Sequence, residues 1–145
     1  SDRPSARAAF GGVTLFRCYD RLEVQREQTV LKTRVLPLAG ITPLPEIGLA
    51  VKTSVVDGPG EWVVCPGGPM VVRCRQGGDE LTSKVGTKSL KKRFIDRKIP
   101  QWERLAVPVI ADDAGVLAVY GFGTDETRKS GGPYIRIEFV PISEN

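Results

Sequence analysis

Proline and glycine divide the chain into short runs of strand-forming residues, and this punctuation limits what the chain can fold into. Valine, isoleucine, threonine and aromatic residues favour strands, whereas proline and glycine between such runs favour turns. In the last run apolar and charged side chains alternate, as in a strand with one buried face. About seven or eight such strands with one or two short helices predict an α+β domain of mainly antiparallel, sandwich-like sheet. The predicted strands are residues 13–19, 29–36, 49–56, 61–65, 70–75, 107–110, 116–120 and 134–140.

The length of 145 residues fits one domain with its own core. We predict a polar tail or linker at residues 1–10, a single domain at residues 11–145, and a loop at residues 37–48 where prolines and glycines cluster. The sequence starts at Ser1 and its only methionine is Met70, so we expect a fragment of a longer protein.

One segment after the middle of the chain predicts a helix. Thr87 is suited to cap its N-terminus, and Pro100 stops it at the other end. Leu90 and Phe94 are four residues apart, so they form a narrow apolar stripe that would lie on the surface of a sheet. Beyond Pro100 a second short helix would pack Trp102 inward. The predicted helices are residues 88–98 and 100–105.

Positive charge is concentrated in the same segment. Residues 84–98 hold seven basic residues and one acidic residue, Asp96, for a local net charge of +6, whereas the whole chain carries +4. Charge gathered in this way repels itself unless it meets an anion, and the commonest extended anion is a nucleic-acid backbone. Arg73 and Arg75, on one face of a predicted strand, would extend the patch if strand and helix pack together. The alternative is a solvated helix face, which is what most charge runs are.

The sequence holds few residues suited to catalysis or metal binding. It has no histidine, which removes Ser-His-Asp and Cys-His catalysis and the usual zinc ligands. The cysteines Cys18, Cys65 and Cys74 lack metal-ligand spacing, and Cys74 is interpreted as a small buried hydrophobe. Asp112 and Asp113 are interpreted as turn residues that face water. We therefore predict no catalytic residue, no metal and no cofactor in this domain.

A serine followed by two glycines, at residues 130–132, is similar to the opening of a phosphate-binding loop in one class of ATP pyrophosphatases. That loop needs an aspartate, a serine and a following helix, whereas here Pro133, Tyr134 and Ile135 lead into a predicted strand. We therefore interpret residues 130–132 as a turn.

Nothing in the sequence indicates a membrane or secreted protein. No apolar run approaches the ~20 residues of a membrane-spanning helix, and no secretory signal is visible. The odd number of cysteines, three, favours a reducing compartment. We therefore predict a cytoplasmic protein with no membrane partner.

Several short motifs occur in the order and spacing of a known family. They run from an R-x-R-x-G-x-D strand and turn, through the basic Leu-Lys-Lys helix and an Ile-Pro pair, to an Arg-x-x-x-Pro strand. As a set they resemble the C-terminal domain of bacterial tRNA(Ile)-lysidine synthase, chiefly over residues 70–121 and more weakly at residues 19–22. Residues 29–65 and 124–145 match no part of that pattern. The motifs are residues 70–79, 86–95, 98–100, 103–110 and 119–121.

The resemblance implies a parent ligase that uses ATP to adenylate the wobble cytidine of tRNA(Ile) with a CAU anticodon and then attaches lysine there. In that family a separate N-terminal domain handles ATP and lysine, so this chain would be inert by itself. The C-terminal domain is understood to grip the tRNA, chiefly at its acceptor stem. Its fold is similar to a domain of the phenylalanyl-tRNA synthetase β subunit. The implied partners are therefore tRNA(Ile) and the remainder of the parent enzyme.

Carried onto this chain, the resemblance implies that basic side chains of the R-x-R strand and the helix contact phosphates of an A-form stem. A second hypothesis is a protein-interaction or interdomain packing module that docks its basic helix on an acidic surface. A third, a self-contained enzyme, is disfavoured by the missing histidine, metal and nucleotide motifs. The candidate tRNA contacts are Arg73, Arg75, Lys84, Lys88, Lys91, Lys92, Arg93, Arg97, Lys98 and Arg104.

Overall fold

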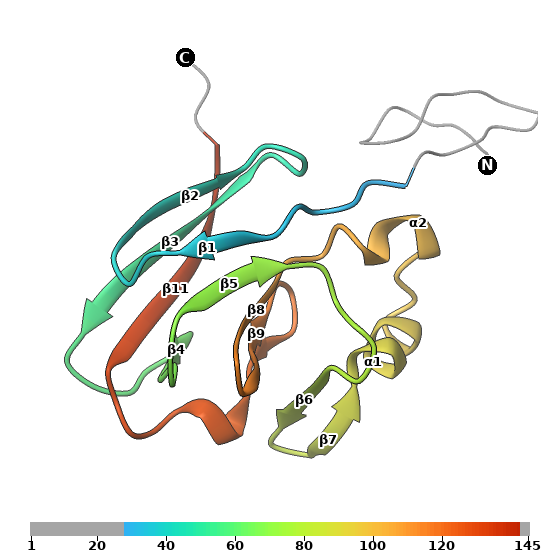
Figure 1. The fold of residues 1–145 in the computed structure, drawn as a ribbon. Helices are drawn as coiled ribbons and strands as arrows, with labels where there is room; N and C mark the ends of the chain where they lie inside the picture. Colours follow the sequence, from blue (N-terminus) through green and yellow to red (C-terminus); the bar gives the residue numbers. More distant parts are fainter. Residues whose placement is uncertain (1–27, 143–145) are drawn as a thin grey trace, which may run out of the picture.

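The computed structural model describes residues 28–142, which form three layers (Figure 1). Two antiparallel sheets pack face to face, and a hairpin with a short helix covers the other face of one of them. No helix in the described part of the chain is long and apolar enough to cross a membrane. The arrangement confirms the predicted α+β class with mainly antiparallel sheet. The predicted tail at residues 1–10 and strand at residues 13–19 lie outside the described residues.

The central layer is a five-stranded sheet in the order β1-β5-β8-β9-β10. Val72 and Ile110 pack toward the second sheet. Val109 and Val119 pack toward the helix layer, because neighbouring side chains of a strand point to opposite faces. All four are fully buried, so this sheet has an apolar core on each face. The strands are β1 (Arg34–Leu36), β5 (Met70–Arg73), β8 (Val109–Asp112), β9 (Gly115–Val119) and β10 (Gly123–Thr124).

The second sheet has four strands in the order β2-β3-β11-β4. Strands β3 and β11 pair along their full length. In β11 the predicted alternation is confirmed, because Ile135 and Ile137 are buried whereas Arg136 and Glu138 are exposed. The strands are β2 (Gly40–Leu44), β3 (Leu49–Val56), β4 (Val63–Val64) and β11 (Tyr134–Pro141).

The third layer carries most of the concentrated positive charge. A hairpin of two strands leads directly into α1, and the buried side chains of Leu81, Leu90 and Phe94 pack against the central sheet. The predicted apolar stripe of the helix is thereby confirmed. The elements are β6 (Glu80–Ser83), β7 (Gly86–Ser89), α1 (Leu90–Asp96), α2 (Gln101–Arg104) and the 3-10 helix η1 (Glu126–Arg128).

Several element predictions are confirmed closely. Strand β3 has the predicted bounds, and β8 and β9 form the predicted hairpin. The second helix is α2, although Trp102 and Leu105 are only half-buried. The loop at residues 130–132 leads directly into β11, as expected for a turn without a following helix.

Other predictions were wrong because strand pairing overrode the local signals. The predicted loop at residues 37–48 contains β2, whose Pro43 is tolerated in a strand at the edge of its sheet. The strand predicted at residues 29–36 forms only at its end, as β1. The strand predicted at residues 61–65 shrinks to β4, because Trp62 before it has a left-handed backbone with φ of 58°.

The start of the basic helix was also predicted wrongly. Lys88 pairs with Leu81 in the hairpin β6–β7, which no local pattern predicted, so α1 begins only at Leu90. The N-cap is Ser89 rather than Thr87, and the Ser89 Oγ accepts a hydrogen bond from the backbone N–H of Lys92 at 3.1 Å.

Candidate nucleic-acid interface

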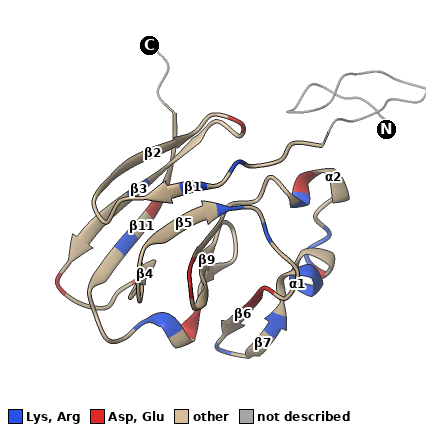
Figure 2. Ribbon diagram, in the orientation of Figure 1, with Lys and Arg blue, Asp and Glu red and all other residues tan. Residues whose placement is uncertain are grey.

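Six of the predicted contact residues are exposed around α1 and the hairpin that precedes it. Burial of Leu90 and Phe94 fixes the inner side of α1, so Lys91 and Lys92 point outward. Figure 2 shows the basic positions gathered on α1 and β7, at one end of the molecule. We call this set the basic face: Lys84, Lys88, Lys91, Lys92, Arg97 and Lys98.

One acidic side chain lies within the basic face. Asp96 accepts a hydrogen bond from Lys88 Nζ at 3.0 Å and lies 3.6 Å from Lys92 Nζ. The hydrogen bond from Lys88 is the main reason that the pKa of Asp96 is lowered, so its carboxylate stays charged. Lys84, Lys91 and Lys98 have no acidic partner within residues 28–142. Their charge is therefore available to an external anion.

Arg73, a predicted contact, lies inside the fold instead of on this face. Its guanidinium donates hydrogen bonds to Asp79 at 2.8 and 3.2 Å and to the backbone oxygen of Cys74 at 3.0 Å. The side chains of Arg73 and Asp79 are each only 10% exposed. Arg75 lies beyond the end of β5 and is half-buried, so it does not form the row with Arg73 that was expected along the strand.

Two further predicted contacts hold the framework together. The half-buried Arg93 donates to the backbone oxygens of Leu81 at 2.7 Å and Gly86 at 3.1 Å, which joins α1 to the hairpin. Arg104 Nε donates to the backbone oxygen of Ile99 at 2.8 Å and braces the connection between α1 and α2. These arginines position the exposed lysines around them.

Arg97 combines exposure with a fixed position. Its guanidinium donates to the backbone oxygen of Gly121 at 3.0 Å and lies 4.1 Å from the ring centre of Phe122. A cation over an aromatic face is attracted by the ring quadrupole. The basic face therefore ends against an aromatic turn between β9 and β10. The sequence did not predict this contact, because α1 and the turn are far apart in the chain.

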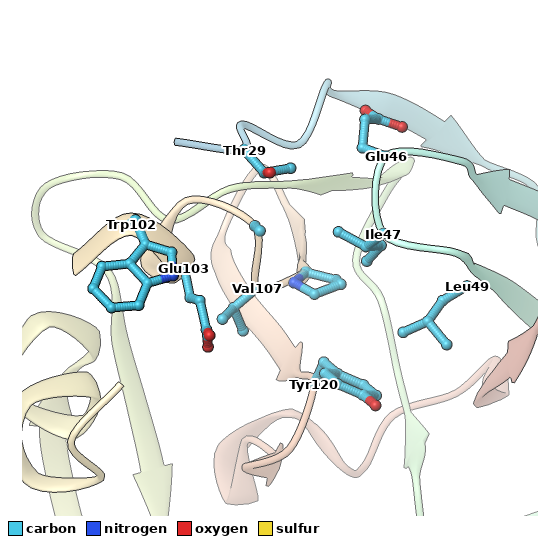
Figure 3. A pocket seen from close by; sticks show the side chains of 10 residues that line it. Thr29, Glu46, Ile47, Leu49, Trp102, Glu103, Val107 and Tyr120 are labelled. Atoms are coloured by element: carbon cyan, nitrogen blue, oxygen red, sulfur yellow. The ribbon is translucent and has the colours of Figure 1, made fainter. Parts of the chain in front are cut away.

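An apolar pocket of about 380 Å³ lies between α2 and the turn from β2 to β3 (Figure 3). Figure 3 shows Trp102 on one side of it, Ile47 on the other and the ring of Tyr120 below. The described residues that line the pocket include Glu46 and Glu103 but no lysine or arginine, so the lining offers no cation to a phosphate. We therefore do not assign it to the backbone of a nucleic acid.

The acidic pair in the β8–β9 turn departs from its predicted role. Asp112 does not face water: its side chain is 1% exposed and accepts a hydrogen bond from Arg128 at 2.5 Å. Burial alone would raise the pKa of Asp112, but hydrogen bonds from Arg128, Gly67 N–H and Ala114 N–H outweigh it and lower the pKa. Asp113 is exposed, as predicted.

Known proteins share this combination of fold and sequence. A family model described as the TilS substrate C-terminal domain matches residues 70–139. A solved structure described as the crystal structure of a TilS C-terminal domain has 30% sequence identity and a TM-score of 0.59. The match covers 78% of this chain and 100% of the solved domain. The chain belongs to the family of C-terminal domains of tRNA(Ile)-lysidine synthase.

Several relatives are longer proteins that this chain matches over part of their length. The tRNA(Ile)-lysidine synthase of Caldanaerobacter subterraneus subsp. tengcongensis is 31% identical over an alignment of 133 positions that covers 81% of this chain and 28% of the relative. The synthase of Clostridioides difficile is 39% identical over 62 residues, or 43% of this chain and 13% of the relative. The bifunctional protein TilS/HprT of Listeria monocytogenes is 51% identical over an alignment of 49 positions that covers 32% of this chain and 8% of the relative. The chain spans less than a third of each of these relatives.

Proposed function

We propose that this domain is the part of a tRNA(Ile)-lysidine synthase that binds the acceptor stem of tRNA(Ile). The parent ligase would modify the wobble cytidine of the CAU anticodon in the cytoplasm. The use of ATP and lysine would belong to another part of that enzyme. This domain would then contribute binding energy and orientation to catalysis carried out elsewhere.

The observation that carries the proposal is the exposure of six cations on one rigid support. Double-stranded RNA displays phosphates and 2′-hydroxyls on a regular surface, and proteins recognise it mostly by shape and backbone contacts. A short helix braced on a sheet presents lysines at fixed spacing to such a surface, and the N-cap, the apolar stripe and Arg93 hold it in place. The charge thus meets an anion without reorganisation of the fold.

We assign the proposed contacts to the basic face. Arg73, Arg93 and Arg104 direct hydrogen bonds into the protein, so we assign them to positioning. Lys91 and Lys98, together with Lys84, supply the unpaired charge. Lys88 and Lys92 share Asp96 and can turn to phosphates at the cost of an exposed ion pair, which is small.

Binding of the 145-residue chain to tRNA(Ile) at several salt concentrations tests the proposal. Lys91→Ala with Lys92→Ala should weaken binding and lower the slope of log affinity against log salt by about one unit for each phosphate interaction that the substitutions remove. The matched control is Lys32→Ala with Lys52→Ala, which removes the same charge from exposed positions outside α1 and its hairpin. It should leave the slope unchanged.

Unchanged affinity of the Lys91/Lys92 variant at both low and high salt would contradict the proposal. An equal loss of tRNA affinity in the control variant would mean that net charge alone explains the effect, and this would also contradict the proposal. If the chain bound no tRNA at low salt but formed a stable complex with the N-terminal part of its parent, the interdomain alternative would replace it.

A further inference from the structure

Trp62 separates two neighbouring surface hollows that the proposed function does not use. One hollow, of about 490 Å³, is lined by Phe122 and Lys84. The other, of about 440 Å³, is lined by Tyr120 and Phe139. Glu61 and Trp62 line both hollows, so the two lie next to each other at the indole. We call the two hollows together the aromatic hollow. Its rings are Trp62, Tyr120, Phe122 and Phe139.

Three rings of the aromatic hollow, Trp62, Tyr120 and Phe139, pack against one another. Trp62 packs edge to face on Phe139 with ring centres 5.8 Å apart, and Tyr120 packs on the same ring at 4.9 Å. Trp62 remains half-buried and Tyr120 is 41% exposed, so both present ring surface to an incoming group. Paired aromatic rings fix each other's orientation and lower the entropic cost of stacking a ligand on them.

The backbone of Trp62 is held in an unusual conformation. Its φ of 58° is uncommon for a residue with a side chain. The backbone oxygen of Trp62 accepts a hydrogen bond from Ile137 N–H of β11 at 2.8 Å, which secures the conformation against the second sheet. This backbone hydrogen bond and the ring contact with Phe139 together hold Trp62 in position.

The aromatic hollow adjoins the basic face at two points. Lys84 of the basic face lines the first hollow directly. Phe122 lines the same hollow and carries the Arg97 guanidinium 4.1 Å from its ring centre. A polyanion that lies along α1 would reach the aromatic rings without leaving the cationic surface.

The charge within the hollow favours a flat neutral group over a phosphate. Glu126 is paired with Lys129 at 3.0 Å, and Glu138 lies 3.9 Å from Lys52. Glu61 lies in no ion pair within residues 28–142, and Arg136, which lines the second hollow with it, offsets its charge. Stacking on aromatic rings beside a cationic track is how proteins hold unpaired bases.

We infer that the aromatic hollow binds unpaired bases of RNA next to the stem held by the basic face. The inference rests on the proposed function, because the stem contact brings the strand to the rings. Stem phosphates would lie on the basic face, and one or two bases beyond the last base pair would stack on Trp62 and Tyr120. Stacking of this kind tolerates any base, so the hollow would add affinity without reading sequence.

Three RNA hairpins with one common stem test the inference: one blunt, one with about four unpaired nucleotides at its 3′ end, and one with the same extension at its 5′ end. The 145-residue chain should bind one of the extended hairpins at least about fivefold more tightly than the blunt one. Trp62→Leu, which keeps apolar packing on Phe139 but removes the indole, should bind all three with the affinity of the blunt hairpin. Tyr120→Leu should reduce the difference in the same direction.

A fluorescence measurement reports the stacking directly. The chain has two tryptophans, so Trp102→Phe leaves Trp62 as the only indole. The extended hairpin should quench its emission, and the blunt hairpin should not. Lys91→Ala with Lys92→Ala should weaken all three hairpins by the same factor, which separates the stem contact from the stacking contact.

The outcomes distinguish the two proposals. Equal affinity of the wild-type chain for all three hairpins, with normal binding to the blunt one, would overturn the inference and leave the proposed function standing. An extension effect that survives Trp62→Leu would also overturn it. Failure of the chain to bind any hairpin would overturn the proposed function and the inference together.

Discussion

The guanidinium of Arg73 and the carboxylate of Asp79 meet at 2.8 Å where each side chain is only 10% exposed. Asp79 also accepts a hydrogen bond from Gln76 N–H at 2.8 Å, and its backbone oxygen accepts one from Leu90 N–H at 2.9 Å. The first residue of α1 is thus tied to the end of β5 through one aspartate. The R-x-R-x-G-x-D motif therefore positions the basic helix and supplies little of its charge.

Removal of either partner of this buried pair should destabilise the domain. Asp79→Asn or Arg73→Ala leaves a buried charge without its partner, which typically costs about 3–5 kcal/mol. The free energy of unfolding from urea denaturation measures the destabilisation. Glu138→Ala is the matched control, because its pair with Lys52 is long and exposed and should contribute less than about 1 kcal/mol. Equal destabilisation in the two pairs would contradict this account of Arg73 and Asp79.

Neutralisation of Asp96 should strengthen RNA binding. Asp96→Asn removes the carboxylate that holds Lys88 and Lys92, so both lysines and one extra unit of net charge become available to phosphates. We expect affinity at low salt to rise about two- to fivefold and the increase to fade at high salt. The control is Asp57→Asn, an exposed acid remote from the basic face. An increase of the same size there would mean that net charge alone explains the effect.

The cap residue of α1 can be identified by a pair of substitutions. Ser89→Ala removes the hydrogen bond to Lys92 N–H and should cost about 0.5–2 kcal/mol of folding free energy. Thr87→Ala removes only an exposed hydroxyl contact with Thr82 and should cost less than Ser89→Ala. Thermal unfolding of both variants decides between a helix that begins at Leu90 and one that begins at Lys88.

Glu46 should make stability depend on acid pH. The hydrogen bond from Arg34, at 2.6 Å, is the main reason that the pKa of Glu46 falls from its ordinary value of 4.5 to about 2. A carboxyl group whose pKa is lower in the folded state stabilises the fold above its unfolded pKa and loses that contribution as pH falls. Glu46→Gln should therefore cost about 1.5–3 kcal/mol at neutral pH.

The pH profile checks the sign of that effect. The difference in unfolding free energy between wild type and Glu46→Gln should be constant above about pH 5 and shrink as pH falls from 4.5 toward 2. Glu138→Gln, in a longer and more exposed pair, should show little difference at any pH. A Glu46→Gln difference that grew on acidification would contradict the assignment.

Local sequence patterns predicted correctly those elements in which strand pairing agrees with the local preference of the residues. Strands β3 and β11 are runs of strand formers with one apolar face, and pairing along their whole length agrees with that preference. Prediction failed where pairing with an adjacent strand outweighed the local signal. Pro43 lies in the edge strand β2 because β2 pairs with β3. Lys88 lies in β7 instead of the helix because it pairs with Leu81.

The sequence by itself determined the sheet-rich class, the position of the basic segment and the family, because these depend on residue type and local spacing. Only the tertiary structure decided which cations face outward. Arg73 and Arg93 turn inward to groups on other elements, while Lys84 and Lys91 stay free of acidic partners within residues 28–142. The aromatic hollow likewise depends on the fold, since its rings come from segments far apart in the chain and meet only when the layers pack. The residue type decides the charge of a side chain. Whether that charge can reach an external anion depends on tertiary contacts, which a local sequence pattern does not show.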